Sequence, residues 1–321
     1  MEQKEPYVLR IDCSQETTSK NELVETFLDL ERLDSNLFRA HHLIGGVSSG
    51  TRVYGGQVIG QAMVAATKTV DEPFCLHSLH CYFIRPADKS KPILYQVDRV
   101  RDSRSFCTRF VKSIQNGENL ATCQLSFHKE EADSIRHQAP MPGVPQPEEC
   151  ESAGVFLERY FTAPSQLSQE GVKAIEAFRK VLDFPTTFDL KLINPRQQIQ
   201  VEIGGPLKFQ VWIKAKTNIG EERRLHHCVA AFMSDITPIG TPIGAHAGAG
   251  FRLGMAASLD HSIWIHKAHF NIDDWVLYET ESTVAADCRS LINGKMWTRA
   301  GELVMSTSQE VLIRPERSKK P

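Results

Sequence analysis

The strongest constraint on the fold is an internal repeat, because each half of the 321-residue chain places one apolar helical segment before a run of strand-like segments. Residues 58–70 are rich in Ala, Val, Met and Gln and contain no proline, which favours a buried helix, and residues 225–234 are also helical in composition. The segments after each helix are rich in aromatic and β-branched residues, as strands are; they comprise residues 77–84, 93–100, 106–115 and 120–127, then 258–264, 275–281, 288–298 and 303–313.

Short sequence echoes follow one order in the two halves, which supports a true repeat. They are Val64-Ala65-Ala66 with Val229-Ala230-Ala231, Ser78-Leu79 with Ser258-Leu259, Leu94-Tyr95 with Leu277-Tyr278, and Gly117-Glu118 with Gly301-Glu302. One helix followed by an antiparallel meander is typical of an α+β unit in which a sheet wraps a single helix. We therefore predict two such units in tandem.

Further local signals refine this prediction. Asn116-Gly117 is a strong hairpin signal, and Asn293-Gly294 and Ala300-Gly301 are interpreted as breaks between strands. Residues 209–215 alternate like a strand, and the spacing of leucines over residues 19–33 predicts an amphipathic helix.

The segment between the halves contains four prolines within residues 140–147, followed by helix-compatible stretches around Phe156-Leu157 and over residues 174–182. We interpret it as a linker that packs over the sheets. The expected division is an N-terminal tail at 1–20, a first domain at 21–130, a linker at 131–204, a second domain at 205–316 and a C-terminal tail at 317–321.

Composition limits the function. Lys and Arg number 37 against 39 Asp and Glu, a formal net charge of -2, so no overall field attracts nucleic acid, and local groups must meet any anionic ligand. The first residues are acidic where a signal peptide is basic, and no apolar run approaches the ~20 residues of a membrane span. Eight scattered cysteines without a Cys-x-x-Cys pair are typical of reduced thiols in an intracellular compartment. We expect a soluble, unprocessed protein.

Two glycine motifs are interpreted as loops. Residues 46–50 match the Gly-x-Ser-x-Gly pattern of a nucleophile elbow, but an elbow follows a strand and opens a helix, whereas the residues after this match look extended. Residues 244–250 are rich in glycine but lack the third glycine of a dinucleotide fingerprint. We expect a turn at the first and a mobile loop over a site at the second.

Histidines do not indicate a metal site. His226-His227-Cys228 has no second cluster with ligand spacing. His261 and His266 are an odd number of residues apart in a predicted strand, so they face opposite sides. We interpret them as isolated polar residues of the core or surface and predict no metal.

A sharper constellation lies in the second half: Asp235 at the end of an apolar helix, Ser258 in an extended segment, and Gln309 within the last apolar strand. Each has an ordinary alternative, as a capping acid, a strand serine and a sheet-surface amide. Taken singly, the ordinary reading is favoured.

Several motifs in order resemble the type II acyl-CoA thioesterase family over roughly residues 21–130 and 205–314, most closely its peroxisomal branch. They include Val53-Tyr54-Gly55-Gly56-Gln57, His77-Ser78-Leu79-His80, Ala231-Phe232-Met233-Ser234-Asp235, Ser258-Leu259-Asp260-His261 and Ser308-Gln309-Glu310. The resemblance implies two tandem hotdog domains, each an antiparallel sheet wrapped around a central helix. Carried over residue by residue, the catalytic residues of the family fall on Asp235, Ser258 and Gln309.

The implied chemistry suits these residues. Hydrolysis of a thioester needs a carboxylate to take a proton from water and neutral partners to orient that water, so Asp235 is the expected base. By analogy with hotdog enzymes, Gly56 and Gln57 are candidate oxyanion donors at a helix N-terminus. No cofactor is expected, because a thioester is already activated toward water. The expected substrate is fatty acyl-CoA.

This sequence also departs from the family pattern at Ala286-Asp287, Ser290 and Val311, and it ends in Lys320-Pro321 where peroxisomal relatives carry a Ser-Lys-Leu type signal. A peroxisomal or a cytoplasmic location therefore stays open. The alternatives to a hydrolase are a non-catalytic acyl-CoA or lipid-binding protein and, ranked last, a hotdog hydratase or dehydratase.

Two further expectations concern sites and assembly. On the Val-Ala-Ala echo, Val70 matches Asp235, so we expect one active site per chain, in the second half. A homo-oligomer, dimer or higher, is also expected.

Overall fold

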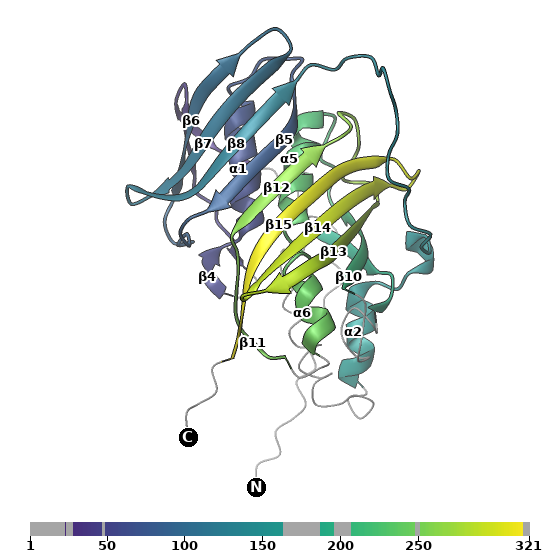
Figure 1. Cartoon of the computed structure of the whole chain (residues 1–321). Coiled ribbons are helices and arrows are strands. Elements are labelled where there is room, and N and C mark those ends of the chain that lie inside the picture. Colours follow the sequence, from purple (N-terminus) through teal and green to yellow (C-terminus); the bar gives the residue numbers. More distant parts are fainter. Residues whose placement is uncertain are drawn as a thin grey trace.

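The computed structural model (Figure 1) describes residues 23, 28–46, 49–162, 187–195, 207–247 and 251–316. Within this part of the chain, one antiparallel sheet of 13 strands dominates the fold, and β3 with β4 forms a separate hairpin. The first-half elements are β1 (Glu31–Asp34), β2 (Leu37–Ala40), β3 (Gly45–Gly46), β4 (Ser49–Val53), α1 (Gly55–Thr67), β5 (Cys75–Phe83), β6 (Ile93–Asp102), β7 (Phe106–Gln115) and β8 (Glu118–His128).

The remaining elements repeat this order after a connecting segment. They are the 3-10 turn η2 (Pro147–Glu149), α2 (Ala153–Thr162), β9 (Phe188–Leu192), β10 (Lys208–Ala215), α5 (Arg223–Ser234), α6 (Gly240–Ala247), β11 (Leu253–Ser258), β12 (Asp260–Ile265), β13 (Val276–Ala286), β14 (Arg289–Thr298) and β15 (Leu303–Pro315).

Strands β5 and β12 pair antiparallel at the centre of the sheet, with His261 opposite Cys81. Outward from β5 lie β8, β7, β6, β2 and β1, and outward from β12 lie β15, β14, β13, β10 and β9. The two halves therefore share one topology, related across the β5–β12 pair. This confirms the predicted α+β architecture with one central helix in each half.

Helices α1 and α5 pack against each other behind the sheet in the view of Figure 1. The Tyr54 hydroxyl donates to the carbonyl oxygen of Phe232 at 2.9 Å, and the two rings meet edge to face at 5.0 Å between centroids. Because the sheet wraps both helices, α1 is buried from Gly56 to Ala66. This contact brings the beginning of α1 next to the end of α5.

The predicted strands are confirmed, with ends that differ by a few residues. Asn116 and Gly117 connect β7 to β8 with φ of 52° and 78°, which is the left-handed geometry of an Asn-Gly hairpin turn. The predicted helix at 58–70 is α1, three residues earlier, and that at 225–234 is α5.

Three local predictions are wrong. Asn293 and Gly294 lie inside β14, where a Cβ on Gly294 would collide with the side chains of Thr307 and Tyr278, so this glycine permits close packing instead of a turn. The end of the predicted helix at 19–33 is strand β1, which pairs with β2. In the described part of that segment, Leu23 and Leu28 are helical, as predicted, and residues 29–33 are not. Residues 244–247, predicted as a loop, belong to helix α6.

Residues 139–145 of the linker pack over the outer face of the second half, as predicted, whereas residues 188–192 form β9 and pair with β10 in the sheet. The indole N–H groups of Trp212 and Trp297 donate to the carbonyl oxygens of Pro145 at 2.8 Å and Ala139 at 3.2 Å. Helix α2 confirms the helical stretch around Phe156, whereas residues 174–182 lie outside the described residues. None of the described helices is both long and apolar enough to cross a membrane.

Candidate active site

Asp235 caps the C-terminus of α5 and is only 7% exposed. Two factors disfavour the negative charge of this carboxylate. Burial removes the water that would solvate it, and the negative end of the α5 dipole lies nearby. Burial raises the pKa of Asp235 to about 6, and hydrogen bonds from Gln309, from the Gly56 backbone N–H and from Ser258 oppose the rise. This acid can therefore exchange a proton near neutral pH.

Gln309 and Ser258 reach Asp235 from two strands of the sheet. Gln309 lies within β15 and is 1% exposed, and Ser258 ends β11, which pairs with β15. The Gln309 Nε2 donates to Asp235 Oδ1 at 2.8 Å and to Ser258 Oγ at 2.6 Å, while Ser258 Oγ lies 3.5 Å from Asp235 Oδ1. The three residues that are dispersed in the sequence thus form one cluster.

The beginning of α1 closes the other side of this cluster. A Cβ on Gly55 would lie 2.8 Å from Asp235 Oδ2 and 3.1 Å from the Phe83 ring, and one on Gly56 would collide with the Phe232 carbonyl oxygen. Position 56 therefore requires glycine, and at position 55 a Cβ would displace the Asp235 carboxylate. Gly55, unlike Gly56, was not singled out from the sequence, although the Gly-Gly pair at a helix entry was the available signal.

Gln57 is completely buried at the same helix start. Its side-chain amide donates to the His42 carbonyl oxygen and accepts from the Ile44 N–H, both at 2.8 Å, and its backbone N–H lies 3.2 Å from the Tyr54 carbonyl oxygen. The side chain thus holds residues 42–44 against α1.

Behind Gln309 lies a buried polar network that sequence reasoning missed. His261 Nδ1 is 2.8 Å from Gln309 Oε1, and His261 Nε2 is 2.9 Å from Ser234 Oγ. The Tyr278 hydroxyl donates to the Ser234 carbonyl oxygen at 2.9 Å. His261 is 0% exposed and His266 is exposed, which confirms that they face opposite sides. The only sequence signal for the inward direction of His261 is its place in the alternating pattern of β12.

Two other motifs have structural roles. Gly46 pairs with Ser49 in the β3–β4 hairpin, so the Gly-x-Ser-x-Gly segment joins two strands, as the turn interpretation predicted, although Ser48 itself lies outside the described residues. Among the described residues, no group of three or more His, Cys, Asp or Glu side chains could hold a metal ion. His226 and His227 instead contact the carbonyl oxygens of Gly220 and Ala268.

The equivalent positions in the first half carry different chemistry. Across the central strands, Cys123 lies opposite Cys81, and Cys81 opposite His261. The Cys81–Cys123 pair in the first half therefore corresponds to His261 and Gln309 in the second. At the end of α1, Arg224 donates to the carbonyl oxygens of Val70 at 3.1 Å and Asp71 at 3.0 Å.

Comparisons with known proteins agree along most of the chain. Residues 44–128 match the family described as acyl-CoA thioesterase N-terminal domain, and residues 161–313 match the acyl-CoA thioesterase C-terminal domain. Mouse acyl-coenzyme A thioesterase 8 is 38% identical over 91% of this chain and 89% of its own. The yeast peroxisomal acyl-coenzyme A thioester hydrolase 1 from Saccharomyces cerevisiae is 23% identical over 89% of this chain and 93% of its own.

A solved structure of an acyl-CoA thioesterase II has the same fold. The crystal structure of an acyl-CoA thioesterase II from Mycobacterium marinum matches with a TM-score of 0.70 and 31% identity, covering 91% of this chain and 98% of that chain. The expected tandem hotdog fold is thereby confirmed. The chain belongs to the acyl-CoA thioesterase II family.

Proposed function

We propose that this protein hydrolyses fatty acyl-CoA to free fatty acid and CoA, with Asp235 as the general base. The observation that carries the proposal is the convergence of a buried carboxylate, a hydroxyl and a side-chain amide from three elements. Asp235 takes a proton from a water molecule as the water oxygen attacks the thioester carbonyl carbon. Ser258 orients this water directly, and Gln309 acts through Asp235 and Ser258, which its –NH2 group holds in place. The carbon–sulfur bond then breaks, and Asp235 returns the proton to the CoA sulfur.

The oxyanion that forms during attack needs a donor placed in advance. The Gly56 N–H faces the Asp235 carboxylate at the positive end of the α1 dipole. This N–H donates to Asp235 in the free site, and a thioester carbonyl beside Asp235 would replace the carboxylate as its acceptor. The role of Gln57 as a second backbone donor stays a prediction, and its side chain supports the site by holding residues 42–44.

We place one active site in each chain, in the second domain, with domain boundaries near residues 21–130 and 205–316. The first half carries Cys81 and Cys123 at the positions of His261 and Gln309. At the end of α1, where the matching position to Asp235 is Val70, Arg224 donates to the carbonyl oxygens of Val70 and Asp71. Titration with a non-hydrolysable acyl-CoA analogue should give one bound ligand per chain, and two equivalent sites would refute this assignment.

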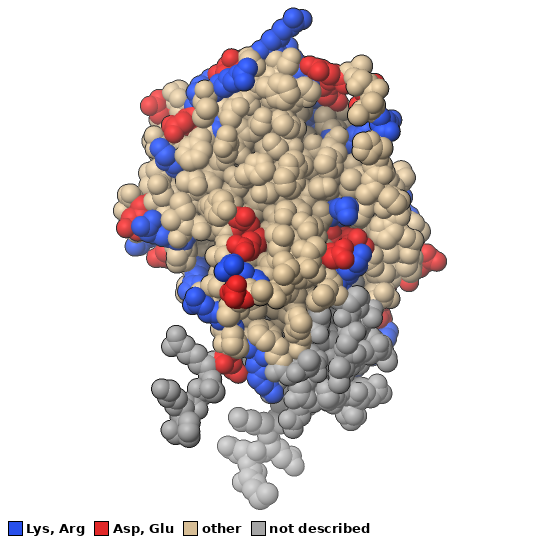
Figure 2. Space-filling model, in the orientation of Figure 1, with Lys and Arg blue, Asp and Glu red and all other residues tan. Residues whose placement is uncertain are grey.

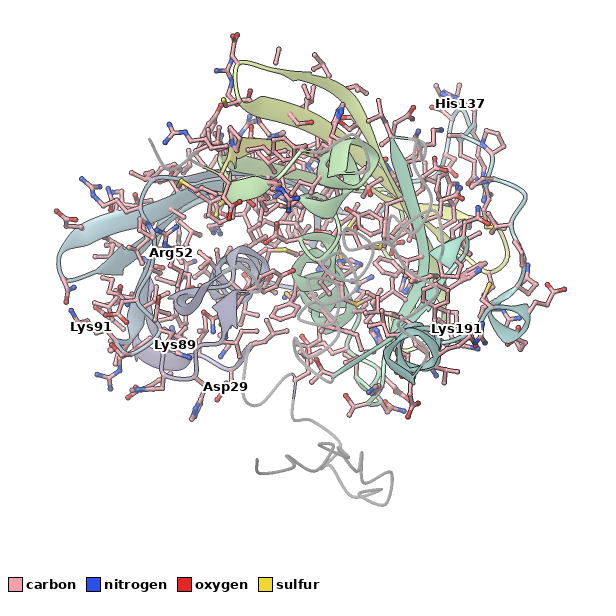
Figure 3. The ribbon with its side chains drawn as sticks, turned by 90° about the horizontal axis from the view of Figure 1, so that it is seen from below. Asp29, Arg52, Lys89, Lys91, His137 and Lys191 are labelled. Atoms are coloured by element: carbon pink, nitrogen blue, oxygen red, sulfur yellow. The ribbon has the colours of Figure 1, made fainter. Side chains whose placement is uncertain are left out.

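The phosphates of CoA require local cations, because the chain has no excess of positive charge. Arg52, Lys89 and Lys91 lie on one side of the molecule in Figure 3. The backbone of Arg52 pairs with that of Asp88 in an isolated antiparallel β-bridge, and the Lys89 N–H donates to the Thr51 carbonyl oxygen. Since Arg52 is four residues before Gly56, at most about 14 Å along the chain, we assign this basic group to the CoA phosphates.

The test of the reaction is a CoA-release assay across short, medium, long, branched and dicarboxylic acyl-CoAs. Wild-type protein should release CoA, and Asp235→Asn should lose activity by about 100- to 10,000-fold. Asp189→Asn, which changes a half-buried acid of β9 outside the site, is the matched control. Tight acyl-CoA binding without any CoA release by wild type would instead indicate a binding protein.

We further propose a homo-oligomer formed through the outer face of β5 and β12. Figure 2 shows that this face has a broad central area with few charged side chains. Tyr82 and Trp264 are 64% and 37% exposed there, which is typical of interface aromatics. Sedimentation should give a dimer or larger species that Tyr82→Lys combined with Trp264→Lys dissociates; a monomeric wild type would contradict the proposal.

The proposed compartment is the peroxisomal matrix, with the cytoplasm as the alternative. The support is the resemblance to the peroxisomal yeast relative. Imaging of a tagged full chain against a peroxisomal marker distinguishes the two.

A further inference from the structure

The amide of Gln309 can serve the site in only one of its two orientations. Its –NH2 group has two hydrogens, and both are used, one toward Asp235 Oδ1 and one toward Ser258 Oγ. If the amide were turned over, its oxygen would face the ionised carboxylate at 2.8 Å, and two acceptors would repel each other. Something must therefore fix the orientation of this side chain.

His261 is the group that contacts the other end of the amide. Its Nδ1 lies 2.8 Å from Gln309 Oε1, and both side chains are almost completely buried, at 0% and 1% exposed. We propose that His261 is a positioning residue that holds the Gln309 amide with its –NH2 group toward Asp235 and Ser258. This inference rests on the proposed function, because the orientation matters through the water that Asp235 activates.

The hydrogen-bond pattern fixes one tautomer of His261. Burial lowers the pKa of His261 to about 4, so the ring is neutral at pH 7 and carries one N–H. A contact with the carbonyl oxygen of Gln309 requires that hydrogen on Nδ1. Nε2 is then an acceptor, and the Ser234 hydroxyl 2.9 Å away donates to it. The same hydroxyl also lies 2.8 Å from the Ala231 carbonyl oxygen, so its hydrogen is shared between two acceptors.

The contacts close a ring, because Ser234 is the residue before Asp235. From Asp235 the ring passes through Gln309 and His261 to Ser234, and the backbone returns to Asp235. Tyr278 anchors it further by donating to the Ser234 carbonyl oxygen. A closed ring defines each member from two sides, which is how buried polar networks fix a single geometry.

The titratable groups that face Asp235 do not change their charge over the pH range in which Asp235 titrates. Tyr54 comes from the start of α1, Tyr278 from β13 and Cys81 from β5. Burial raises the pKa of both tyrosines, and the hydrogen bond with Cys123 together with burial raises the pKa of the Cys81 thiol. All three are neutral over the pH range in which Asp235 titrates. A change in the acid limb of the activity profile therefore reports on Asp235 and its hydrogen bonds.

The test compares His261→Leu, which removes both ring contacts, with His261→Asn, which keeps a donor near the position of Nδ1. His227→Leu is the matched control, since His227 is also buried and its pKa is also lowered to about 4 by burial, but its ring donates to Ala268 away from the site. Thermal melts and circular dichroism establish that each variant is folded, and CoA release gives kcat, KM and the pH profile.

For His261→Leu we expect kcat to fall about 10- to 100-fold with little change in KM. In this variant the fall in activity at acidic pH, the acid limb of the profile, should move to higher pH. The reason is that the Gln309 hydrogen bond, which lowers the pKa of Asp235, is lost. His261→Asn should recover most of kcat and the wild-type limb. If His261→Leu and His227→Leu behave alike in kcat and acid limb, His261 has only a structural role.

A second measurement is independent of turnover. In ¹⁵N-histidine spectra of wild type at pH 7, the resonance that is absent from His261→Leu should be that of a neutral ring protonated on Nδ1. A ring protonated on Nε2 alone would overturn the proposal whether or not the protein hydrolyses acyl-CoA. A wild type that releases no CoA, yet shows the Nδ1–H tautomer, would contradict the proposed function and leave the amide-orienting contact supported.

Discussion

Gln309 on β15 donates its side-chain amide to the carboxylate of Asp235 at the end of α5, at 2.8 Å, in a site where both side chains are buried. The two residues are 74 positions apart in the sequence. Because Asp235 is the general base in the proposed reaction, this contact sets both the pH range and the geometry of catalysis.

Activity should depend on the ionised form of Asp235. Its pKa of about 6 predicts that kcat/KM is constant above about pH 7 and falls as pH decreases through 6, because the protonated acid cannot accept a proton from water. Steady-state rates from pH 4.5 to 8.5 measure this limb. A profile that stays flat down to pH 5 would show that this carboxylate is not the base.

The same carboxylate should lower stability at high pH. Folding raises the pKa of Asp235 from its ordinary 3.8 to about 6, so the ionised form is disfavoured in the folded state. The cost is absent below about pH 4, increases as pH rises through 6, and is full at pH 8. Asp235→Asn should therefore raise the free energy of unfolding by about 1–3 kcal/mol at pH 8, and by much less at pH 4. Urea denaturation at both pH values tests this, and a destabilised variant at pH 8 would contradict it.

Gly55→Ala should impair the site without unfolding the protein. The added Cβ would lie 2.8 Å from Asp235 Oδ2, so the carboxylate has to move, and we expect kcat to fall about 10- to 100-fold. The matched control is Gly154→Ala near the start of α2, where a Cβ meets nothing within 4 Å. Equal activity of both alanine variants would show that α1 does not constrain Asp235.

Charge reversal of the basic group should weaken substrate binding. In the double variant Arg52→Glu and Lys89→Glu, KM for acyl-CoA should rise by about tenfold at low salt with kcat retained, and high salt should reduce the difference. Arg104→Glu is the control, because Lys89 precedes the first residue of β6 and Arg104 follows its last residue, at the other end of the strand. Unchanged KM in the double variant would place the CoA phosphates elsewhere.

The secondary structure was readable from the sequence wherever local patterning decides it. Alternating strands and Asn116-Gly117 gave the strands and the first hairpin, because these signals act over a few residues. The same pattern failed at Asn293-Gly294, where contacts of β14 with Thr307 and Tyr278 outweigh the turn preference. It also failed over residues 31–33, where pairing of β1 with β2 overrides the helical spacing of the leucines.

The sequence by itself determined the repeat, the two central helices and, through family resemblance, the residues Asp235, Ser258 and Gln309. Only the tertiary structure decided that the start of α1 closes the site at the end of α5, and that His261 stands behind Gln309. These relationships depend on the pairing of β5 with β12 and on the packing of α1 against α5. Contacts between residues so far apart in the chain leave no periodicity to read, because they arise from how the two halves dock and not from any local preference.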